Sequence, residues 1–501
     1  MTAPAAATKP RLLTVNRNQL IMRTFDVEEL VPSDHPARAI WEFVGTLDLS
    51  LYYDAIASRE GGAGRPAWDP YMLVSLWIYA IKDGVGCARE IERLCEHDPA
   101  YQWITGMETV NHHTLSDFRM SNKEALERLF IEILGILSAE GLITLERVAH
   151  DGTKIRASAG ADSFRSEDRI KEHLEVARQQ VAAMGDPRTA EEVGPRVAKA
   201  RMRAATERVG RLEKAVVELE KIRATRRGEE RKDKARVSET DPESRIMKTS
   251  DGGYAPCYNA QISTDSAQGV IVAAGISQAS NDKQELIPAV ESIEKNMEEK
   301  PDEIVVDGGY TSRENIIAMA EAKIGMVGSI GDGKAQSVGQ LERRGVAPEY
   351  RPEKFSYDPE KNSFQCPMGC ALNLAGTEER PGCKCHHYRA RVEDCLACPV
   401  KMLCSPRTEN FGRMITRTVE DSKVVDFRKK METDAAKSAY KTRGPLAEFS
   451  NLWLKSKNNL TQFHVRGVEK VNMELQWCSL VRNIQIWILK RWKTGLAAVG
   501  T

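Results

Sequence analysis

The apolar positions of residues 26–138 recur at helical spacing, in short runs separated by glycine and proline. One run begins at Pro70 and continues to Ile81, and proline is well tolerated at the first position of a helix. Pro36 marks another helix start, and residues 87–94 show the same periodicity. We therefore predict a compact helical domain over residues 16–140. A DNA-binding domain, a plain helical bundle and a dimerisation module all fit this pattern.

Beyond Gly141 the pattern becomes strand-like. Residues 142–149 are apolar enough for a strand, and residues 254–265 and 270–276 predict a hairpin. A helix, a buried strand, a second helix and a last strand are predicted at residues 283–294, 303–307, 312–323 and 324–330. This order, strand–strand–strand–helix–strand–helix–strand, predicts a mixed α/β domain whose first part covers residues 141–336.

Two segments interrupt the predicted α/β domain. Residues 163–236 are rich in Ala, Glu, Lys and Arg, and their apolar residues recur at helical intervals, which predicts a helical hairpin or a coiled coil. Residues 337–406 form a cysteine-rich insertion. Residues 407–495 are predicted to be the C-terminal helical part of the α/β domain.

Length and charge limit the class of protein. A chain of 501 residues is too long for one ordinary domain, and a hydrophobic content of 41% is enough for a sizeable core. The formal net charge is zero, but residues 399–501 carry 19 Lys and Arg against 9 Asp and Glu. A basic C-terminal fifth suits contact with a phosphate backbone, and a solvated basic face would look the same.

The cysteine content and the apolar runs indicate the compartment. The first ten residues lack the apolar segment of a secretory signal, and the longest apolar run is too short to span a bilayer. We expect a cytoplasmic protein without a membrane partner, with a flexible tail at residues 1–15. Seven of the 11 cysteines fall between Cys366 and Cys404. In a reducing compartment such clustering indicates a metal site rather than disulfides.

Two aspartates each come after a predicted strand and before a glycine. Asp307 ends the apolar run 304–306, which is typical of a strand buried on both faces, and Asp151 follows residues 142–149. One Asp-Gly pair alone is ordinarily just a turn. Functional groups of α/β sheets gather at the carboxyl ends of strands, so we expect both carboxylates at one rim of the sheet. Two close carboxylates favour a bound cation, and their oxygens suit Mg²⁺ or Mn²⁺.

Glu448 is the candidate for a third acid. Gly444-Pro445 is expected to end one segment and to start a helix, which places Glu448 near its first turn. Lys455 lies two turns later on the same face, and Tyr440 and Arg443 come just before the glycine. These groups suit a metal ion and a phosphate. An ordinary charged surface helix would carry the same residues, so only the three acids together favour a site.

Taken together, these motifs resemble the DDE transposases of bacterial insertion sequences, over nearly the whole chain. The stretches that carry the resemblance are residues 65–70 with Tyr79-Ala80, residues 112–119, 149–154, 241–245, 258–261 and 306–310, and the six residues that separate Glu448 from Lys455. The motifs are short, and their order along the chain makes the resemblance specific. The resemblance implies a catalytic domain of ribonuclease-H-like fold.

The resemblance also implies a mechanism. Asp151, Asp307 and Glu448 would hold two Mg²⁺ or Mn²⁺ ions about 3.5–4 Å apart, for cleavage of DNA and for joining of the freed 3′-hydroxyl to target DNA. The implied partners are the terminal inverted repeats of a mobile element and the target DNA, bound by a homodimer. Asn259 and Gln261 are predicted on a strand beside the site, in a structural role.

Three residues of the third acidic motif are implied to bind DNA phosphate: Tyr440, Arg443 and Lys455. The family usually leaves three residues between the arginine and the glutamate, whereas four separate Arg443 from Glu448. This departure bears on the implied roles of Tyr440 and Arg443 and hardly affects the assignment of Glu448 as the third acid.

The cysteine spacing predicts a structural zinc site. Cys395, Cys398 and Cys404 supply three thiolates within ten residues, and Cys366 is the best fourth ligand. Four thiolates around Zn²⁺ would fold an insertion too polar to hold itself together. Other candidates for the ligand set are Cys370, Cys383, Cys385, His386 and His387. Cysteines without any metal are the alternative interpretation.

Three other functions fit parts of the sequence. The first is a metal-dependent nuclease on the same fold, which would cleave DNA without joining ends. The second is a catalytically inactive, DNA-binding remnant of a transposase. The third is a helical scaffold protein, suggested by residues 163–236, which would leave the two strand-end aspartates unexplained.

Overall fold

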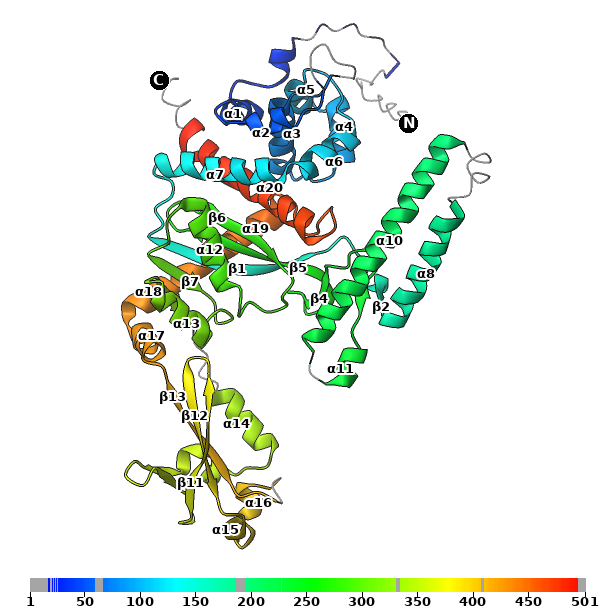
Figure 1. Ribbon diagram of the computed structural model, residues 1–501. Coiled ribbons are helices and arrows are strands. Elements are labelled where there is room, and N and C mark those ends of the chain that lie inside the picture. Colours follow the sequence, from blue (N-terminus) through cyan, green and yellow to red (C-terminus); the bar gives the residue numbers. More distant parts are fainter. Residues whose placement is uncertain are drawn as a thin grey trace, which may run out of the picture.

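The computed structural model describes residues 26–58, 66–184, 194–226, 228–329, 334–406 and 410–493, together with residues 17, 18, 20, 22 and 24. Arg65 and the tail predicted for residues 1–15 lie outside this part. The protein is mixed α/β, as predicted. Figure 1 shows a helical region packed on a central sheet, a helical hairpin that projects sideways and a second, smaller sheet that forms a separate lobe. Among the described residues, no helix combines the length and apolar character needed to cross a membrane.

The N-terminal helices pack around one helix that is buried along almost its whole length. This helix, α3 (Pro70–Lys82), begins at the predicted proline, and Asp69 caps it by accepting a hydrogen bond from the amide of Tyr71. A helix that is apolar all round belongs in a core. The other elements of this region are η1 (Val27–Leu30), α1 (Pro36–Val44), α2 (Ser50–Asp54), α4 (Ala88–His97), α5 (Pro99–Thr105), α6 (His112–Ser121) and α7 (Lys123–Ala139).

The central sheet has six strands in the order β4-β5-β1-β7-β8, with β6 also paired to β5. Their bounds are β1 (Arg147–Arg156), β4 (Arg245–Lys248), β5 (Tyr254–Asp265), β6 (Ile271–Ser277), β7 (Glu303–Val306) and β8 (Gly325–Gly328). β1 is antiparallel to β5 and parallel to β7. Two helices connect the later strands, α12 (Leu286–Met297) between β6 and β7 and α13 (Arg313–Glu321) between β7 and β8. Chain order and helix placement agree with the predicted strand–strand–strand–helix–strand–helix–strand pattern.

Strand β1 differs from its prediction at both ends. The sequence predicts a strand over residues 142–149 that stops before Asp151, whereas β1 runs from Arg147 to Arg156 and contains this aspartate. Its antiparallel partner β5 pairs with it as far as Arg156, while the parallel pairing with β7 ends at Ala149. From His150 onward, β1 is therefore held by β5 on one side and is free of β7 on the other.

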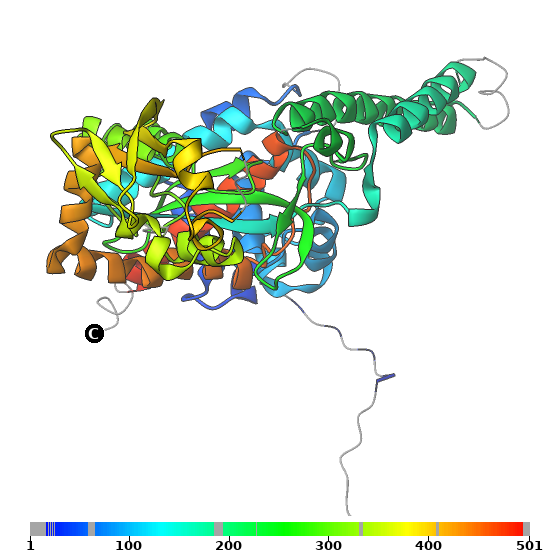
Figure 2. The same ribbon diagram turned by 90° about the horizontal axis from the view of Figure 1, so that it is seen from below.

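The predicted helical interruption of the sheet is a two-helix hairpin with its own apolar core. It contains η2 (Ala161–Ser163), β2 (Phe164–Arg165), α8 (Glu167–Met184), α10 (Pro195–Ala224), α11 (Glu229–Asp233) and β3 (Val237–Ser238). β2 and β3 pair antiparallel and close the base of the hairpin. Figures 1 and 2 show α8 and α10 extending away from the body of the molecule.

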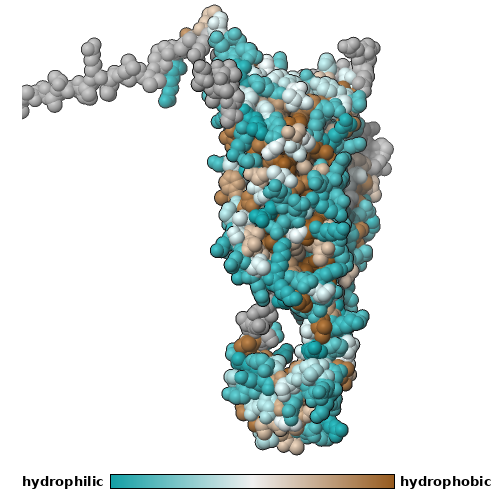
Figure 3. Space-filling model, turned by 90° about the vertical axis from the view of Figure 1, so that its left-hand side faces the viewer, coloured by the Kyte–Doolittle hydropathy of each residue, from teal (hydrophilic) through white to brown (hydrophobic). Residues whose placement is uncertain are grey.

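The cysteine-rich segment folds into a five-stranded antiparallel sheet with short helices. The elements are α14 (Lys334–Arg343), η3 (Pro348–Tyr350), η4 (Pro352–Lys354), β9 (Ser356–Asp358), β10 (Ser363–Gln365), β11 (Ala371–Arg380), β12 (Cys383–Ala390), α15 (Val392–Leu396), α16 (Lys401–Cys404) and β13 (Met414–Glu420). The strand order is β13-β12-β11-β10-β9. β13 lies beyond residue 406, the predicted end of this insertion, because β12 offers it an edge to pair with. In Figure 3 a narrowed region sets this lobe off from the body.

The C-terminal helices return to the central sheet. They are α17 (Ser422–Glu432), α18 (Asp434–Arg443), the π-helical turn η5 (Gly444–Glu448), α19 (Phe449–Ser456), α20 (Val468–Trp487) and a second π-helical turn η6 (Ile488–Trp492). α20 is buried between β6 and the N-terminal helices α3 and α7. Its first amides are held by a motif noted in the sequence, because Gly467 N donates to Asp241 (3.2 Å) and Val468 N to Glu243 (3.0 Å).

The prediction that Gly444-Pro445 ends a helix is wrong. α18 continues through η5 into α19 without a break. A proline in an α-helix lacks the amide hydrogen and its ring collides with the carbonyl four residues earlier. A π-turn, whose hydrogen bonds span five residues, widens the helix at this point, so the chain passes the proline without ending the helix.

Candidate active site

Asp151 and Asp307 occupy equivalent positions on the two parallel strands. The last paired residues of β1 and β7 are Ala149 and Val305, and each aspartate lies two residues further along the chain, Asp151 within β1 and Asp307 directly after the end of β7. Paired strands are about 4.8 Å apart, so each aspartate follows one of two residues that are neighbours across the sheet. The Gly309 amide donates to Asp307 (2.7 Å), which makes the tight turn that follows β7. The predicted convergence of these two acids at one rim of the sheet thus has a direct structural basis.

The Asp151 carboxylate faces the C-terminal helices. Asn451 Nδ2 on α19 donates to it at 3.0 Å, and Arg443 Nη1 lies 3.9 Å away. Burial is the main cause that raises the pKa of Asp151 to about 6, while Arg443 lowers this pKa and the negative charges of Asp307 and Asp282 raise it. The side chain is only 18% exposed. A buried carboxylate with a second acid beside it is stabilised in its charged form by a nearby cation, which favours a bound metal ion here.

The opposite face of β1 packs tightly over Gly152. A Cβ at this position would meet Gln261 Nε2 at 2.6 Å, Asp282 Oδ1 at 2.7 Å and the Tyr310 hydroxyl at 2.9 Å. Contacts this close are not found for real Cβ atoms, so the three side chains can converge only on a glycine. The glycine after the first aspartate is thus required for packing at the site.

A buried polar network connects the two aspartate motifs beneath the site. His150 Nε2 and the Tyr310 hydroxyl both contact Gln261 Oε1, at 3.0 and 2.6 Å, and His150 Nδ1 contacts Ser263 Oγ at 2.9 Å. Burial lowers the pKa of His150 to about 4, so its ring is neutral at ordinary pH. His150 precedes Asp151, and Tyr310 lies three residues after Asp307. Gln261, placed beside the site by the sequence, therefore joins the backbone turns that carry both acids.

Asp282 is an acidic residue of this region that the sequence analysis missed. Its Oδ1 accepts hydrogen bonds from Asn259 (2.7 Å) and Gln261 (2.9 Å), and Lys154 Nζ lies 3.5 Å away. Its Cβ is 3.8 Å from the position of a Cβ on Gly309. Asp282 therefore lies between the two aspartate turns. Its only sequence signal is an acid shortly after a predicted strand, which is too common to single it out.

Glu448 lies at the junction of the π-turn and α19, and its helix packs on β1. Lys455, two turns later, donates to Thr153 Oγ1 at 2.6 Å, and Asn451, in the turn between them, donates to Asp151. Residues 448, 451 and 455 share one helix face, so Glu448 lies on the strip that faces the free part of β1. The Glu448 side chain is exposed and is folded back toward Gly444. A Cβ atom at position 444 would lie 3.7 Å from Glu448 Oε1.

The π-turn accounts for the unusual spacing of the third acidic motif. Four residues intervene between Arg443 and Glu448, which is the i to i+5 spacing of hydrogen bonds in a π-helix. The usual three intervening residues give the i to i+4 spacing of an α-helix. The additional residue is taken up inside the turn. Arg443 thus stays one turn before Glu448, and its guanidinium lies beside Asp151 and 6.0 Å from the centre of the Tyr440 ring. Tyr440 packs against Val305 and Val327 under β7 and β8.

The metal ligands predicted from the sequence are not gathered into a finished cage. In the described part of the chain, no three His, Cys, Asp or Glu side chains are arranged to hold one metal ion. The carboxylates fit Mg²⁺ or Mn²⁺ by their chemistry, since hard oxygen donors suit both ions. Asp151 and Asp307 are neighbours through the strand register, and completing the set requires the exposed Glu448 side chain to turn from Gly444 toward them.

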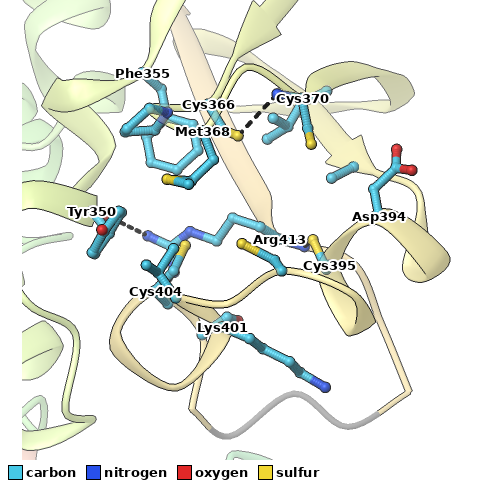
Figure 4. A pocket seen from close by; sticks show the side chains of 16 residues that line it. Tyr350, Phe355, Cys366, Met368, Cys370, Asp394, Cys395, Lys401, Cys404 and Arg413 are labelled. Atoms are coloured by element: carbon cyan, nitrogen blue, oxygen red, sulfur yellow. Dashed lines mark hydrogen bonds between the residues drawn. The ribbon is translucent and has the colours of Figure 1, made fainter.

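Five of the clustered cysteines line one small cavity of the lobe, with a volume of about 40 Å³. They are Cys366, Cys370, Cys395, Cys398 and Cys404. Figure 4 shows the Arg413 side chain among them, and its Nη1 donates to the Cys404 carbonyl at 3.1 Å. The amides of Cys370 and Arg413 donate to the sulfurs of Cys366 (3.2 Å) and Cys395 (3.3 Å). All four cysteines predicted as zinc ligands are therefore in one place, with Cys370 as a fifth.

The other candidates for the zinc ligand set lie elsewhere on β12. Cys383 and Cys385 have sulfurs 4.0 Å apart, His386 Nδ1 contacts Thr377 Oγ1 at 2.9 Å, and His387 Nδ1 contacts Thr416 at 3.0 Å. Side chains on a strand alternate between its faces, and these four are spread along the cross-strand ladder instead of reaching the cavity. They do not line the cavity of the five cysteines.

Two aspartates at the free end of a parallel strand pair, with an acid-bearing helix and several cations beside them, define a candidate site for phosphoryl transfer. Two family models described as a transposase DDE domain match residues 221–394 and 365–487, and one described as a transposase domain (DUF772) matches residues 25–121. The chain belongs to the DDE transposases of insertion sequences. That family generally uses divalent metal ions such as Mg²⁺.

Comparison with solved structures adds one relative of low similarity. A cryo-EM structure of the piggyBac transposase synaptic complex with hairpin DNA shares 8% identity with this chain, at a TM-score of 0.30, and the alignment covers 94% of this chain and 75% of that one. At that score the likeness says nothing about the site. No curated protein is similar enough to count as a match.

Proposed function

We propose that this protein is a DNA transposase that binds the terminal inverted repeats of an insertion sequence and catalyses metal-dependent strand cleavage and strand transfer. The observation that carries the proposal is the equivalent placement of Asp151 within β1 and of Asp307 directly after β7, together with the pKa of Asp151, which is raised to about 6, mainly by burial. Two neighbouring carboxylates at the open end of a strand pair suit two-metal phosphodiester chemistry.

The architecture we propose follows from the order of the elements. The central sheet with α12, α13 and α17–α20 would be a ribonuclease-H-like catalytic domain, formed by residues 141–336 and 407–495. Residues 163–236 and 337–406 would be insertions in it, the second continuing into β13. Residues 16–140 would be the helical DNA-binding domain, and two copies of the chain would act together on the two element ends.

Each group of the site has a task in this proposal. Asp151, Asp307 and Glu448 would hold two Mg²⁺ or Mn²⁺ ions, which supply Lewis-acid activation of the attacking oxygen and stabilisation of the leaving oxygen when bound. Lys455 and Arg443 would neutralise phosphate charge at the free part of β1. Burial lowers the pKa of Lys455, whose ammonium reaches Thr153 on the same face as Asp151.

Three other groups would assist without touching the metal. Tyr440 would stack on or hydrogen-bond to DNA beside Arg443. Gln261 and Asn259 would keep Asp282 and the two aspartate turns in place through their amides, because rigid surroundings hold reacting groups in register. DNA cleavage and joining then proceed by direct displacement at phosphorus, without a covalent bond between protein and DNA.

Substitution of one acid tests the proposal. Asp307→Asn keeps the size of the side chain and removes the charge, so cleavage of DNA that carries the element ends is expected to fall by at least a factor of about 10³, the order lost with a main electrostatic group. Binding of the same DNA should change less than about threefold, which is under 1 kcal/mol. Asp434→Asn, at a fully exposed side chain on α18, is the matched control and should behave as the wild type.

The outcomes separate the rival functions. Full cleavage by Asp307→Asn refutes the site. Cleavage by the wild type without joining of a 3′-hydroxyl end to a second duplex identifies a nuclease. DNA binding with no cleavage by the wild type, in Mg²⁺ or Mn²⁺, identifies an inactive remnant.

We further propose that the lobe binds Zn²⁺ through Cys366, Cys395, Cys398 and Cys404. The five thiols around one cavity support this, and so does the half-buried Arg413 beside them, because a zinc ion with four thiolates carries net negative charge that a guanidinium offsets. Cys370, whose amide already donates to Cys366, is the competitor for one position. The role would be structural, holding the lobe together or presenting it to DNA.

A further inference from the structure

A large hollow with basic walls lies between the helical hairpin and the central sheet. Its volume is about 790 Å³, and it is lined by the C-terminal end of α10, the segment after α11, strand β4 and the loop after β6. Five cations line it, Lys221, Arg226, Lys234, Arg236 and Arg245, and its described lining contains no Asp or Glu. Figure 1 shows α10, α11 and β4 meeting in this region.

Some of these cations are already paired and others are available. Lys221 and Arg245 share the buried Glu218, and Lys234 pairs with Glu230. Arg226 Nη1 donates to the Arg231 carbonyl at 2.8 Å, an interaction that leaves its charge unneutralised. The structure gives Arg236 no ion pair among the described residues, and its side chain is exposed. The hollow therefore has net positive charge available to an outside anion.

A second basic hollow, of about 420 Å³, lies beside the turn that follows Asp307. It is lined by the Gly308-Gly309 turn that follows Asp307, by the start of α13, and by Lys283, Arg313, Arg380 and Arg428. Glu314 is the single acidic residue of its described lining. Glu420 pairs with both Arg313 and Arg428, and Glu378 pairs with Arg380. Lys283 has no ion pair among the described residues.

One loop joins the two hollows and carries an acid of the site between them. Residues 278–281 line the first hollow and Lys283 lines the second. Asp282, the residue between them, points toward Gly152 and the aspartate turns. The two basic regions are therefore lined by the residues directly before and directly after Asp282 in one loop. A DNA strand with regularly spaced phosphates could pass from one hollow to the other along this loop.

We propose that these two hollows hold the DNA backbone on either side of the phosphate that is cut, with the loop 278–283 lying under the strand. The inference rests on the proposed function and adds to it the place where the DNA lies. Phosphate contacts of this kind are independent of base sequence and fix the register of DNA on a protein. The helical hairpin then acts as one wall of the DNA path, through the end of α10 nearest the sheet.

Salt dependence of DNA binding measures these contacts directly. The probe is a duplex of about 40 base pairs of arbitrary sequence, bound to the full-length protein without divalent ions so that no cleavage occurs. Each lost phosphate contact lowers the slope of log Kd against log salt concentration by about 0.9. Arg226→Ala with Arg236→Ala is expected to lower the slope by about two, and Lys283→Ala by about one, while the unfolding temperature stays that of the wild type.

A control on the same hairpin distinguishes local from general charge effects. Lys199→Ala with Arg201→Ala removes two exposed cations from α10 roughly 33 Å from Lys221, at 1.5 Å per residue. This variant should keep the wild-type slope. The inference is overturned if the hollow variants keep the wild-type slope. It is also overturned if the control variant lowers the slope as much as the hollow variants do.

Failure of the inference and failure of the proposed function look different. If the wild type binds and cleaves end DNA, and the hollow variants show the same salt dependence as the wild type, the proposed DNA path is wrong and the enzyme assignment stands. If the wild type shows no salt-dependent binding to any duplex, the proposed function fails and the inference fails with it.

Discussion

At the scale of single residues, the notable group is Asp151. Its carboxyl is mostly buried, and the charges of Asp307 and Asp282 act in the same direction as burial, so its pKa rises to about 6. A raised pKa means that the folded protein favours the protonated form. Without metal, this group stabilises the fold below pH 4, and the stabilisation is lost as the pH rises through 6. A bound cation would remove this penalty by replacing the proton.

Metal binding should therefore compete with protonation of Asp151. Affinity for Mn²⁺, measured by calorimetry on the intact protein, is expected to be constant above about pH 7 and to fall about tenfold per pH unit below 6. In the metal-free protein at pH 8, Asp151→Asn should raise the free energy of unfolding by roughly 2–3 kcal/mol, and at pH 4 the difference should vanish. An affinity that does not change between pH 7.5 and 5 would contradict this account.

The residues of the site differ in how far the sequence reveals them. Asp151 and Asp307 could be predicted because a strand pattern, an acid and a glycine are local features. The contact of Asn451 with Asp151 and the packing of Asp282 over Gly152 could not, since they join positions 300 and 130 residues apart. Such contacts depend on the register of β1 with β5 and on where α19 settles on the sheet.

At the scale of elements, the π-turn η5 determines how the third acid meets the sheet. It lets one continuous helix carry Arg443 before the turn and Glu448, Asn451 and Lys455 after it, although proline lies within. Sequence rules for proline predict an interruption here, because they assume α-helical geometry. A single additional residue changes that geometry, and periodicity alone does not show it.

Removing the extra residue tests the importance of this turn. With Pro445→Ala and Leu446 deleted, the turn should become α-helical and keep Arg443 one turn before Glu448, so DNA cleavage should stay within about tenfold of the wild type, or 1.4 kcal/mol in barrier. Pro445→Ala with Leu452 deleted should abolish cleavage, since it rotates Lys455 by about 100° away from Thr153. Equal activity in both variants would show that the helix register does not matter.

Most elements could be predicted from hydrophobic periodicity. α3, the helical hairpin and the order of β1, β5, β6, β7 and β8 all follow from it. The extension of β1 and the presence of β13 do not, because both depend on a partner strand that supplies an open edge. Strand ends are decided by pairing and not by composition.

At the scale of the whole molecule, two additions flank the central sheet. The helical hairpin contributes one wall of the basic hollow beside Asp282, and the cysteine-rich lobe meets the second hollow through Arg380. Each addition has its own apolar cluster, so each can be stable with few contacts to the sheet. Their functions should therefore be separable from catalysis.

Zinc removal should act on the lobe alone. The protein as isolated is expected to hold about one Zn²⁺ per chain by elemental analysis. Cys395→Ser with Cys398→Ser should lose it and should increase amide hydrogen exchange in β9–β13, while exchange in the central sheet stays unchanged. Cys383→Ser, on β12 outside the cavity, is the control and should retain the metal. A metal content of zero in wild-type protein grown with zinc would refute the site.

The short ribbon of β2 with β3 has a consequence for how the chain folds. Roughly a hundred residues separate β1 from β5, yet the pairing of Phe164 with Ser238 reduces the span that must close to roughly 25 residues. Loop-closure entropy grows with the logarithm of length, so this shortcut favours the joining of the two strands by roughly 1 kcal/mol. The hairpin can thus form first from local contacts and bring β1, which carries Asp151, together with β5, which carries Asn259 and Gln261, and the length of the hairpin can vary without delaying that step.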